Sequence, residues 1–160
     1  MPRDPIPTWF FVLVVVRRGD RFLLVQESKP GQPWYLPAGR VEPGEGFLAA
    51  AERETIEEAG IPIAVEGVLR VEHTPLSGGT ARVRVILAAH PRDATPPKLV
   101  ADGESLGADW YTLEDMRHID LRSDEVFRYC EYVARGGRVY PLDLLSSELA
   151  HPAGARGDAA

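Results

Sequence analysis

Residues 39–61 decide the fold, and they read GRVEPGEGFLAAAERETIEEAGI. From Glu45 to Ala59 the apolar residues recur at helical spacing, which predicts an amphipathic helix. Its apolar stripe consists of Leu48, Ala51, Thr55 and Ala59. Gly60 suits the left-handed backbone that closes a helix, and Pro62 prevents the helix from continuing. We therefore expect a helix that follows an irregular loop over residues 37–44.

The acidic side chains of this helix share one face. Glu54 precedes Glu57 by three residues and Glu58 by four, and both spacings bring side chains together. Like charges at these spacings oppose helix formation by about 0.2–0.5 kcal/mol per pair. Three converging carboxylates form a hard-oxygen site that suits Mg²⁺ or Mn²⁺. A solvated acidic face, the ordinary state of charged residues, explains the same pattern equally well.

The loop before the helix favours the metal site. Gly39 has no side chain, so its backbone carbonyl can come close to a metal ion. Glu45 belongs to the first turn of the helix, where the helix dipole favours a carboxylate that can tie the loop to the helix.

Apolar and β-branched segments on both sides of this stretch predict a mixed sheet. We expect strands over residues 9–17, 21–27, 63–71, 81–89 and 109–112, a short extended segment over 34–36 and a second helix over 124–135. Because the first strand is apolar almost throughout, it should be covered on both faces. The fold class expected from this order is α/β (α+β), with helices packed against the sheet. We expect one domain over residues 9–145, a flexible N-terminus over 1–8 and a disordered tail over 146–160.

Composition limits the possible functions. The chain has 160 residues, of which 44% are hydrophobic and 26% charged, as in an ordinary globular domain. A formal net charge of −6 argues against binding a nucleic-acid polymer, and no apolar run is long enough to span a membrane. The N-terminus does not resemble a signal peptide. A single cysteine, Cys130, excludes an internal disulfide and fits the reducing cytoplasm.

Residues 39–61 resemble the Nudix box of the MutT-like Nudix hydrolases. In that pattern a glycine, five residues, a glutamate and seven residues precede Arg-Glu, an apolar residue, any residue, Glu-Glu, any residue, glycine and an apolar residue. All charged and glycine positions match, and Thr55 is the one departure, since the family more often has Leu, Ile or Val there. The resemblance extends over about residues 9–135. It implies an α/β/α sandwich with a mixed sheet and the Nudix loop-helix.

The resemblance also implies the chemistry. Such enzymes hydrolyse a phosphoanhydride of a nucleoside diphosphate linked to another group, and they use Mg²⁺, with Mn²⁺ as an alternative. By this resemblance Glu54, Glu57 and Glu58 would be metal ligands together with the Gly39 carbonyl. Either Glu54 or Glu58 would help to deprotonate the attacking water, and Arg53 would orient Glu54 through a charge-assisted hydrogen bond.

A further carboxylate is expected from a later loop. In MutT-like proteins such a group lies six residues before a tryptophan, and Glu104 has this spacing from Trp110. The alternatives are that Glu104 is an ordinary loop residue or that Asp102 or Asp109 has this role.

The substrate is expected to be a small nucleotide, handled by a monomer or a homodimer. Residues 34–45, 101–106 and 121–122 are similar to those of animal Nudix proteins that hydrolyse 8-oxo-guanine nucleoside diphosphates. An ADP-ribose or nucleotide-sugar pyrophosphatase is an alternative, because Pro75 lies near the proline of ADP-ribose enzymes. A catalytically silent nucleotide-binding module is another.

Six side chains are candidate substrate contacts. Trp34 and Tyr35 could stack on a base, although alternation along a strand suggests that only one of them faces the site. Arg40 follows the metal loop, whereas Arg82 and Arg84 share a strand face and could meet phosphates or lie in solvent. Arg122 precedes the last helix, where several relatives read the base.

Overall fold

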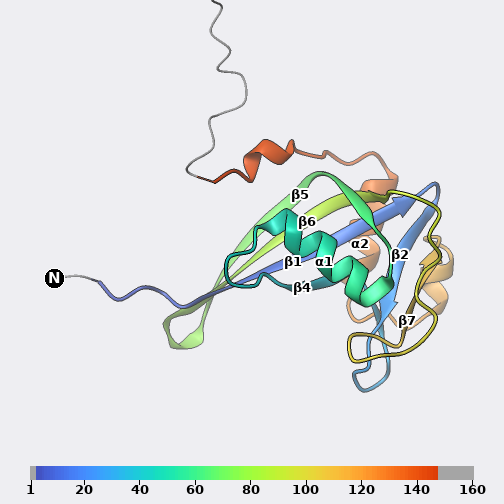
Figure 1. Ribbon diagram of the computed structural model, residues 1–160, viewed down its shortest axis with the longest axis horizontal. Helices are drawn as coiled ribbons and strands as arrows, with labels where there is room; N and C mark the ends of the chain where they lie inside the picture. The colour runs from blue at the N-terminus through green and yellow to red at the C-terminus, as the bar shows by residue number, and fades with distance from the viewer. Residues whose placement is uncertain (1–2, 148–160) are drawn as a thin grey trace, which may run out of the picture.

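Strand β1 (Thr8–Arg18) lies at the centre of a mixed sheet in the computed structural model, which describes residues 3–147. It runs parallel to β6 (Thr80–Pro91) and antiparallel to both β2 (Arg21–Gln26) and β4 (Ala38–Arg40). Residues 12–16 are at most 3% exposed, so this part of the apolar strand is covered on both faces as expected, whereas Trp9 and Phe10 are 46% and 42% exposed. Figure 1 shows β1, β5 and β6 side by side along the long axis.

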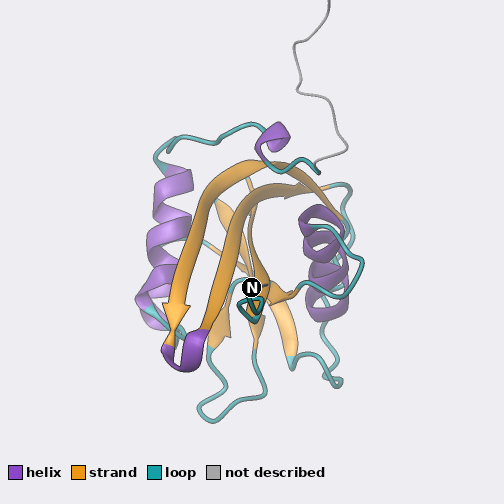
Figure 2. Cartoon of the chain, turned by 90° about the vertical axis from the view of Figure 1, so that its left-hand side faces the viewer, coloured by secondary structure: helices purple, strands orange, loops and turns teal. Residues whose placement is uncertain are grey.

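The remaining strands complete the sheet, and one long helix covers each of its two faces. The other strands are β3 (Trp34–Tyr35), β5 (Ile63–Leu76) and β7 (Gly107–Tyr111), and the helices are α1 (Phe47–Ala59) and α2 (Asp124–Ala134). Short 3-10 helices span Ser77–Gly79, Asp115–His118 and Leu142–Leu144. Figure 2 shows one long helix on each side of the strands, so the α/β/α sandwich with a mixed sheet is confirmed.

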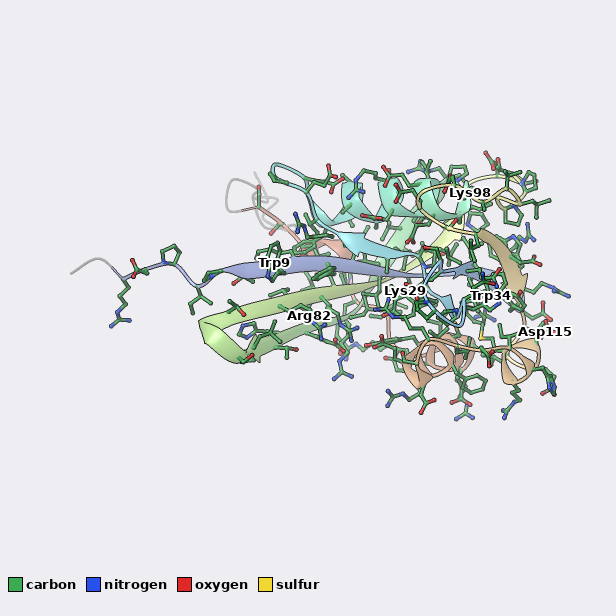
Figure 3. The ribbon with its side chains drawn as sticks, turned by 90° about the horizontal axis from the view of Figure 1, so that it is seen from below. Trp9, Lys29, Trp34, Arg82, Lys98 and Asp115 are labelled. Carbon is green, nitrogen blue, oxygen red and sulfur yellow. The ribbon has the colours of Figure 1, made fainter. Side chains whose placement is uncertain are left out.

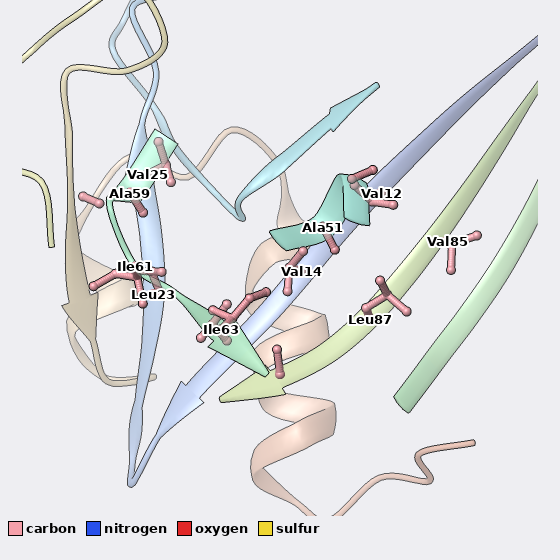
Figure 4. Close-up of a cluster of buried hydrophobic side chains, with 14 of the residues drawn as sticks. Val12, Val14, Leu23, Val25, Ala51, Ala59, Ile61, Ile63, Val85 and Leu87 are labelled. Carbon is pink, nitrogen blue, oxygen red and sulfur yellow. The ribbon is translucent and has the colours of Figure 1, made fainter. Parts of the chain in front are cut away.

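Successive side chains of β1 point to opposite faces of the sheet, and each set forms a separate hydrophobic core with one of the two helices. Val12 and Val14 pack with Ala51 of α1 and with Leu87, and Figure 4 shows this cluster between the helix and the strands. Leu13 and Val15 face the opposite way and pack with Val126 and Cys130 of α2. The apolar stripe expected on the first helix is therefore the face that packs against the sheet.

Some boundaries differ from those expected. Helix α1 begins at Phe47 rather than Glu45, with Gly46 at its N-cap, and Gly60 closes it with φ +72°. Strand β5 continues to Leu76 rather than Val71, because residues as far as the hairpin turn pair with β6. Pro75 is tolerated there because β5 lies at the sheet edge. Strand β4 lies inside the loop that was expected to be irregular.

Divergence of β1 from β2 opens the space for a site. The two strands pair only at Arg17 with Phe22 and at Arg18 with Arg21. Beyond that point β4 pairs with β1, whereas β3 and β7 pair with β2. The chain crosses from one group of strands to the other between Tyr35 and Ala38, and a cavity of about 410 Å³ lies there.

The expectations for the chain ends are only partly covered by the described residues. Within the described part of the expected N-terminal segment, Thr8 already belongs to β1 and Pro7 accepts a backbone hydrogen bond from Ala81. Residues 1–2 and 148–160 lie outside the described residues. The flexible N-terminus, the single domain over 9–145 and the disordered tail stay predictions. Among residues 3–147, no helix has the length and apolar character needed to cross a membrane.

Candidate active site

Arg53 joins the loop to the acidic helix. Its guanidinium donates to Glu45 through Nε and Nη2, at 2.8 and 2.9 Å, and to the Arg40 carbonyl at 3.0 Å. Nη1 donates to Glu54 at 2.8 Å and to Glu57 at 3.0 Å. Glu45 also accepts the backbone N–H of residue 42. One planar guanidinium therefore fixes both ends of the loop and two of the expected metal ligands.

Glu54 lies against the backbone of Gly39. The Glu54 side chain is almost fully buried, and a Cβ atom on Gly39 would lie 1.8 Å from its carboxyl carbon. Residue 39 therefore has to be glycine, for reasons of space rather than of backbone angle. Burial raises the pKa of Glu54 above its ordinary value, and the Arg53 guanidinium acts against this shift.

Glu58 projects from the same helix towards β4 and the cavity. Its Oε2 accepts the backbone N–H of Ala38 at 2.9 Å. Burial, together with the negative charges of Glu54, Glu27 and Glu104, raises the pKa of Glu58 to about 8, and the Ala38 hydrogen bond acts against this shift. The carboxylates from α1 and from two loops therefore face a common region.

The loop that carries Glu104 is fastened to the end of α1. Lys98 donates its backbone N–H to Ala59 and its ammonium to the Glu57 carbonyl, at 2.8 and 2.6 Å. Its ammonium also binds Asp102, which accepts the backbone N–H groups of Glu104 and Ser105. Figure 3 shows Lys98 beside α1. Ser105 donates to the carbonyl of residue 58 at 2.6 Å, so the loop satisfies the free carbonyls of the helix end.

The cavity of about 410 Å³ combines an apolar floor with charged walls. Residues from β1, β2, β3, β4, β6, α1 and several loops line it: Phe11, Leu13, Val25, Glu27, Ser28, Lys29, Tyr35, Leu36, Ala38, Gly39, Glu58, Arg82, Arg84, Glu104 and Arg122. Arg84 bonds Glu72 and Glu125, and Tyr35 donates to Glu125 at 2.5 Å. Among the described residues, the buried Nε of Arg82 has no hydrogen-bond partner. Figure 3 shows Arg82 on β6.

Seven of the twelve predicted site residues line the cavity: Tyr35, Gly39, Glu58, Arg82, Arg84, Glu104 and Arg122. Arg53, Glu54 and Glu57 do not line it but are bonded to one another on the adjacent helix. The other two, Arg40 and Trp34, lie elsewhere. The Arg40 side chain lies over the Trp9 ring, 4.6 Å from its centroid, in a different hollow.

Trp34 packs edge-on against Tyr111 and does not line the cavity, as strand alternation suggested for one member of the Trp34–Tyr35 pair. Of the two aspartates considered as rivals to Glu104, Asp102 supports the loop and Asp109 is exposed on β7.

Sequence reasoning missed Glu27 and Glu125. Glu27 follows Val25 by two residues, and this period of two along β2 puts both side chains in the cavity. That spacing is a signal that could have identified Glu27. Glu125 pairs with Arg84 across 41 positions of sequence, and no local pattern indicates such a contact.

The donor groups fit a hard divalent cation. They are carboxylate oxygens with one glycine carbonyl, which are the ligands that Mg²⁺ prefers, and Gly39 leaves room where any side chain would meet Glu54. In residues 3–147, no three acidic, histidine or cysteine side chains are arranged to hold a metal ion as they stand. The hydrogen bonds explain this, because Arg53 holds Glu54 and Glu57 while Ala38 holds Glu58.

The loop, helix α1 and the cavity beside them belong to a domain of the NUDIX family. The family model described as the NUDIX domain matches residues 9–130, so the chain belongs to that family of hydrolases, which act on phosphoanhydrides of small nucleotides and generally use a divalent metal.

Comparison with individual relatives gives a similar result. The 8-oxo-dGDP phosphatase NUDT18 of Homo sapiens is 37% identical over 125 residues, which are 76% of this chain and 37% of that protein. This chain therefore spans little more than a third of the length of that relative. Phosphatase NudJ of Shigella boydii is 29% identical over 84% of this chain and 88% of its own length. A NUDIX hydrolase from Nitrosomonas europaea superposes with a TM-score of 0.72 at 28% identity, covering 88% of this chain and 97% of its own.

Replacing Arg53 with lysine should loosen the site. A lysine ammonium cannot bridge Glu45, Glu54, Glu57 and the Arg40 carbonyl at once. We expect kcat for nucleotide hydrolysis to fall about 10- to 100-fold, as when a metal ligand loses its supporting partner. Steady-state kinetics over a Mg²⁺ titration would measure this. Arg135→Lys, at a surface pair with Glu131 on α2, is the control. Equal kinetics for both variants would contradict the role given to Arg53.

Proposed function

We propose that this chain is a Mg²⁺-dependent pyrophosphohydrolase, with Mn²⁺ as an alternative metal, that cleaves a phosphoanhydride of an oxidised purine nucleotide of the 8-oxo-guanine type. The observation that carries the proposal is the position of Glu58, Gly39 and Glu104 at one side of a cavity whose other walls present Arg82 and Arg84. Such a cavity offers carboxylates for a metal and cations for phosphate oxygens.

In this proposal Glu54, Glu57, Glu58 and the Gly39 carbonyl would hold the metal, which when bound neutralises phosphate charge and activates water. Arg53 keeps Glu54 and Glu57 oriented. Either Glu54 or Glu58 accepts the proton that the attacking water loses. Burial favours that proton on each of them.

The reaction itself exchanges one bond for another. The water oxygen forms a bond to phosphorus, and the bridging phosphorus–oxygen bond breaks as the leaving phosphate departs. Glu104 is fastened beside Glu58 through the Ser105 hydrogen bond, so it acts at the same position. The unpartnered Nε of Arg82 is suited to a phosphate oxygen.

The substrate class rests on the relatives. A protein whose name describes 8-oxo-dGDP hydrolysis is 37% identical to this chain, and the chain retains every glutamate of the box. The ADP-ribose alternative rested on Pro75, which pairs with Ala81 at the far end of the β5–β6 hairpin and does not line the cavity. Nothing in the described cavity favours a nucleotide sugar or a silent module.

The proposal extends to compartment and assembly. Cys130 of α2 is a free cysteine that is buried in the core between this helix and the sheet. A free thiol is compatible with a protein that acts in the reducing cytoplasm. We keep a monomer or a homodimer as the assembly, with no nucleic-acid polymer or membrane as partner.

A substrate panel tests the proposed function. Incubated with Mg²⁺, the protein should convert 8-oxo-dGDP to the nucleoside monophosphate and inorganic phosphate faster than dGDP, ADP-ribose or a uridine diphosphate sugar. A chelator should abolish turnover, and adding Mg²⁺ or Mn²⁺ should restore it. Chromatography of the products identifies the phosphorus that is attacked. If no member of the panel is hydrolysed with either metal, the silent-module alternative replaces this proposal.

A further inference from the structure

Glu27 presents one unsatisfied oxygen to the cavity. Its Oε1 accepts hydrogen bonds from Lys29 at 2.6 Å and from Arg122 at 3.0 Å. Its Oε2 is buried and, among the described residues, has no hydrogen-bond partner. A buried carboxylate oxygen without a donor is unfavourable by about 1–3 kcal/mol or more, so a ligand that brings a donor would remove this penalty.

The backbone around Glu27 is fixed, so the free oxygen has a defined position. The Glu27 backbone N–H donates to the Pro33 carbonyl at 3.0 Å, and that of Arg122 donates to the Trp34 carbonyl at 2.9 Å. The Arg122 guanidinium lies 4.4 Å from the centroid of the Tyr35 ring. Only 17% of the Glu27 side chain is exposed. Glu27 is therefore a preorganised acceptor rather than a mobile surface group.

The charges around Glu27 decide which part of a substrate can meet it. A phosphate oxygen would be repelled by the carboxylate and offers it no donor. Two cations, Lys29 and Arg122, already bind Glu27, whereas the Glu58 carboxylate accepts only the Ala38 N–H among the described residues, so a metal ion is better placed at Glu58 than at Glu27. What remains is a neutral donor on the non-phosphate part of the substrate.

The walls beside Glu27 favour a base over a sugar as that donor. Val25, Leu36 and the Tyr35 ring line the same cavity, and their apolar and aromatic surfaces suit a flat heterocycle. A base edge carries amino and ring N–H groups that can donate hydrogen bonds to a carboxylate.

We propose that Glu27 is a specificity-determining residue that accepts a hydrogen bond from the exocyclic amino group of the substrate's base. The inference rests on the proposed nucleotide hydrolysis and deepens it. Because a guanine-type edge has an amino group that hypoxanthine lacks, Glu27 would favour guanine-type substrates.

Glu27→Gln tests this role. The variant keeps the size of the side chain but removes its charge and lets an amide N–H face the donor. We expect kcat/KM for 8-oxo-dGDP to fall about 10- to 100-fold, mainly through a higher KM, as for loss of a hydrogen bond to a charged group. For the matching 8-oxo-hypoxanthine nucleotide the fall in kcat/KM should be at least several-fold smaller. The Mg²⁺ concentration that gives half-maximal rate should not change. Glu131→Gln, which removes an ion-paired glutamate from the outer side of α2, is the matched control.

The outcomes separate this inference from the proposed function. If the wild type hydrolyses 8-oxo-dGDP but Glu27→Gln lowers both substrates equally and shifts the Mg²⁺ dependence, Glu27 is a metal ligand and the inference is wrong. If the ratio of ribose to deoxyribose substrates changes instead of the base ratio, Glu27 binds the sugar and the inference is again wrong. If the wild type hydrolyses no nucleotide, the proposed function fails and the inference fails with it.

Discussion

Replacing Glu58 with glutamine is expected to lower kcat on the order of 10²- to 10³-fold and, at pH 8 and above, to make the metal-free protein more stable. The loss of activity follows because an amide is a poor metal ligand and cannot accept the proton of the attacking water. The gain in stability follows because a buried carboxylate is unfavourable when it ionises without a metal. Glutamine keeps an oxygen that can accept the Ala38 N–H.

The pH dependence of the free energy of unfolding distinguishes this explanation. The folded-state pKa of Glu58 is about 8 and its ordinary value is 4.5, so the metal-free folded protein retains a proton that the unfolded chain releases. The stability that this proton contributes is present in full below pH 4.5 and is lost as the pH rises through about 8. The loss should be on the order of 5 kcal/mol in wild type, because the two pKa values differ by about 3.5 and each unit of difference corresponds to about 1.4 kcal/mol, and it should be absent in Glu58→Gln.

Thermal unfolding in a chelator between pH 5 and pH 9 measures the difference. The two proteins should have similar stability at pH 5 and diverge as the pH rises, with the variant higher. Adding Mg²⁺ should then raise the melting temperature of the wild type more than that of the variant, because only the wild type retains all the ligands. Parallel curves across this range would show that Glu58 does not carry the pH dependence.

Replacing Gly39 with alanine should have an effect of similar size on kcat, on the order of 10²-fold or more. The added methyl would lie 1.8 Å from the Glu54 carboxyl carbon, so one of them must move. Gly39 is held opposite Val12 in the sheet, and Glu54 is buried and bonded to Arg53. Because neither side yields easily, we also expect the free energy of unfolding to fall by about 1–3 kcal/mol.

Gly46→Ala is the control for this substitution. Gly46 is the N-cap of the same helix, its φ is −90°, and nothing lies within 4 Å of a Cβ placed there. Its replacement should change kcat little and stability by no more than about 1 kcal/mol. Equal kinetic losses in the two variants would mean that any change near the helix start disturbs the site, and that contact with Glu54 is not the cause.

The sequence predicts the local parts of this molecule well. The carboxylate spacing, the closing Gly60 and the apolar stripe of α1 all depend on residues within one helix, and the structure has each of them. The apolar character of β1 also predicted the burial of residues 12–16 on both faces. Glu104 could be predicted only through the family resemblance, because its position depends on the hydrogen bonds that Lys98 and Ser105 make to the end of α1.

Contacts between distant segments were harder to predict. Arg40 follows Gly39 in sequence, yet its side chain turns to Trp9 of the neighbouring strand and leaves the cavity. Glu125 does not line the cavity but binds Arg84, which does, and Arg84 belongs to a strand that ends more than thirty residues before α2 begins. Proximity in sequence is therefore a poor guide to which arginines line the cavity.

The parallel pairing of β1 with β6 has a consequence for synthesis of the chain on the ribosome. Trp9 pairs with Arg82, seventy-three positions further along the chain, and no pair in this ladder is closer in sequence. At roughly 5–20 residues per second, β1 therefore waits several seconds before its partner is made. During that time the segment Val12–Val16, which is at most 3% exposed in the folded protein, lacks the hydrogen-bonding partner for one edge of the strand. Because an unpaired apolar strand edge can pair with another chain, this segment is an aggregation hazard while the chain is being made.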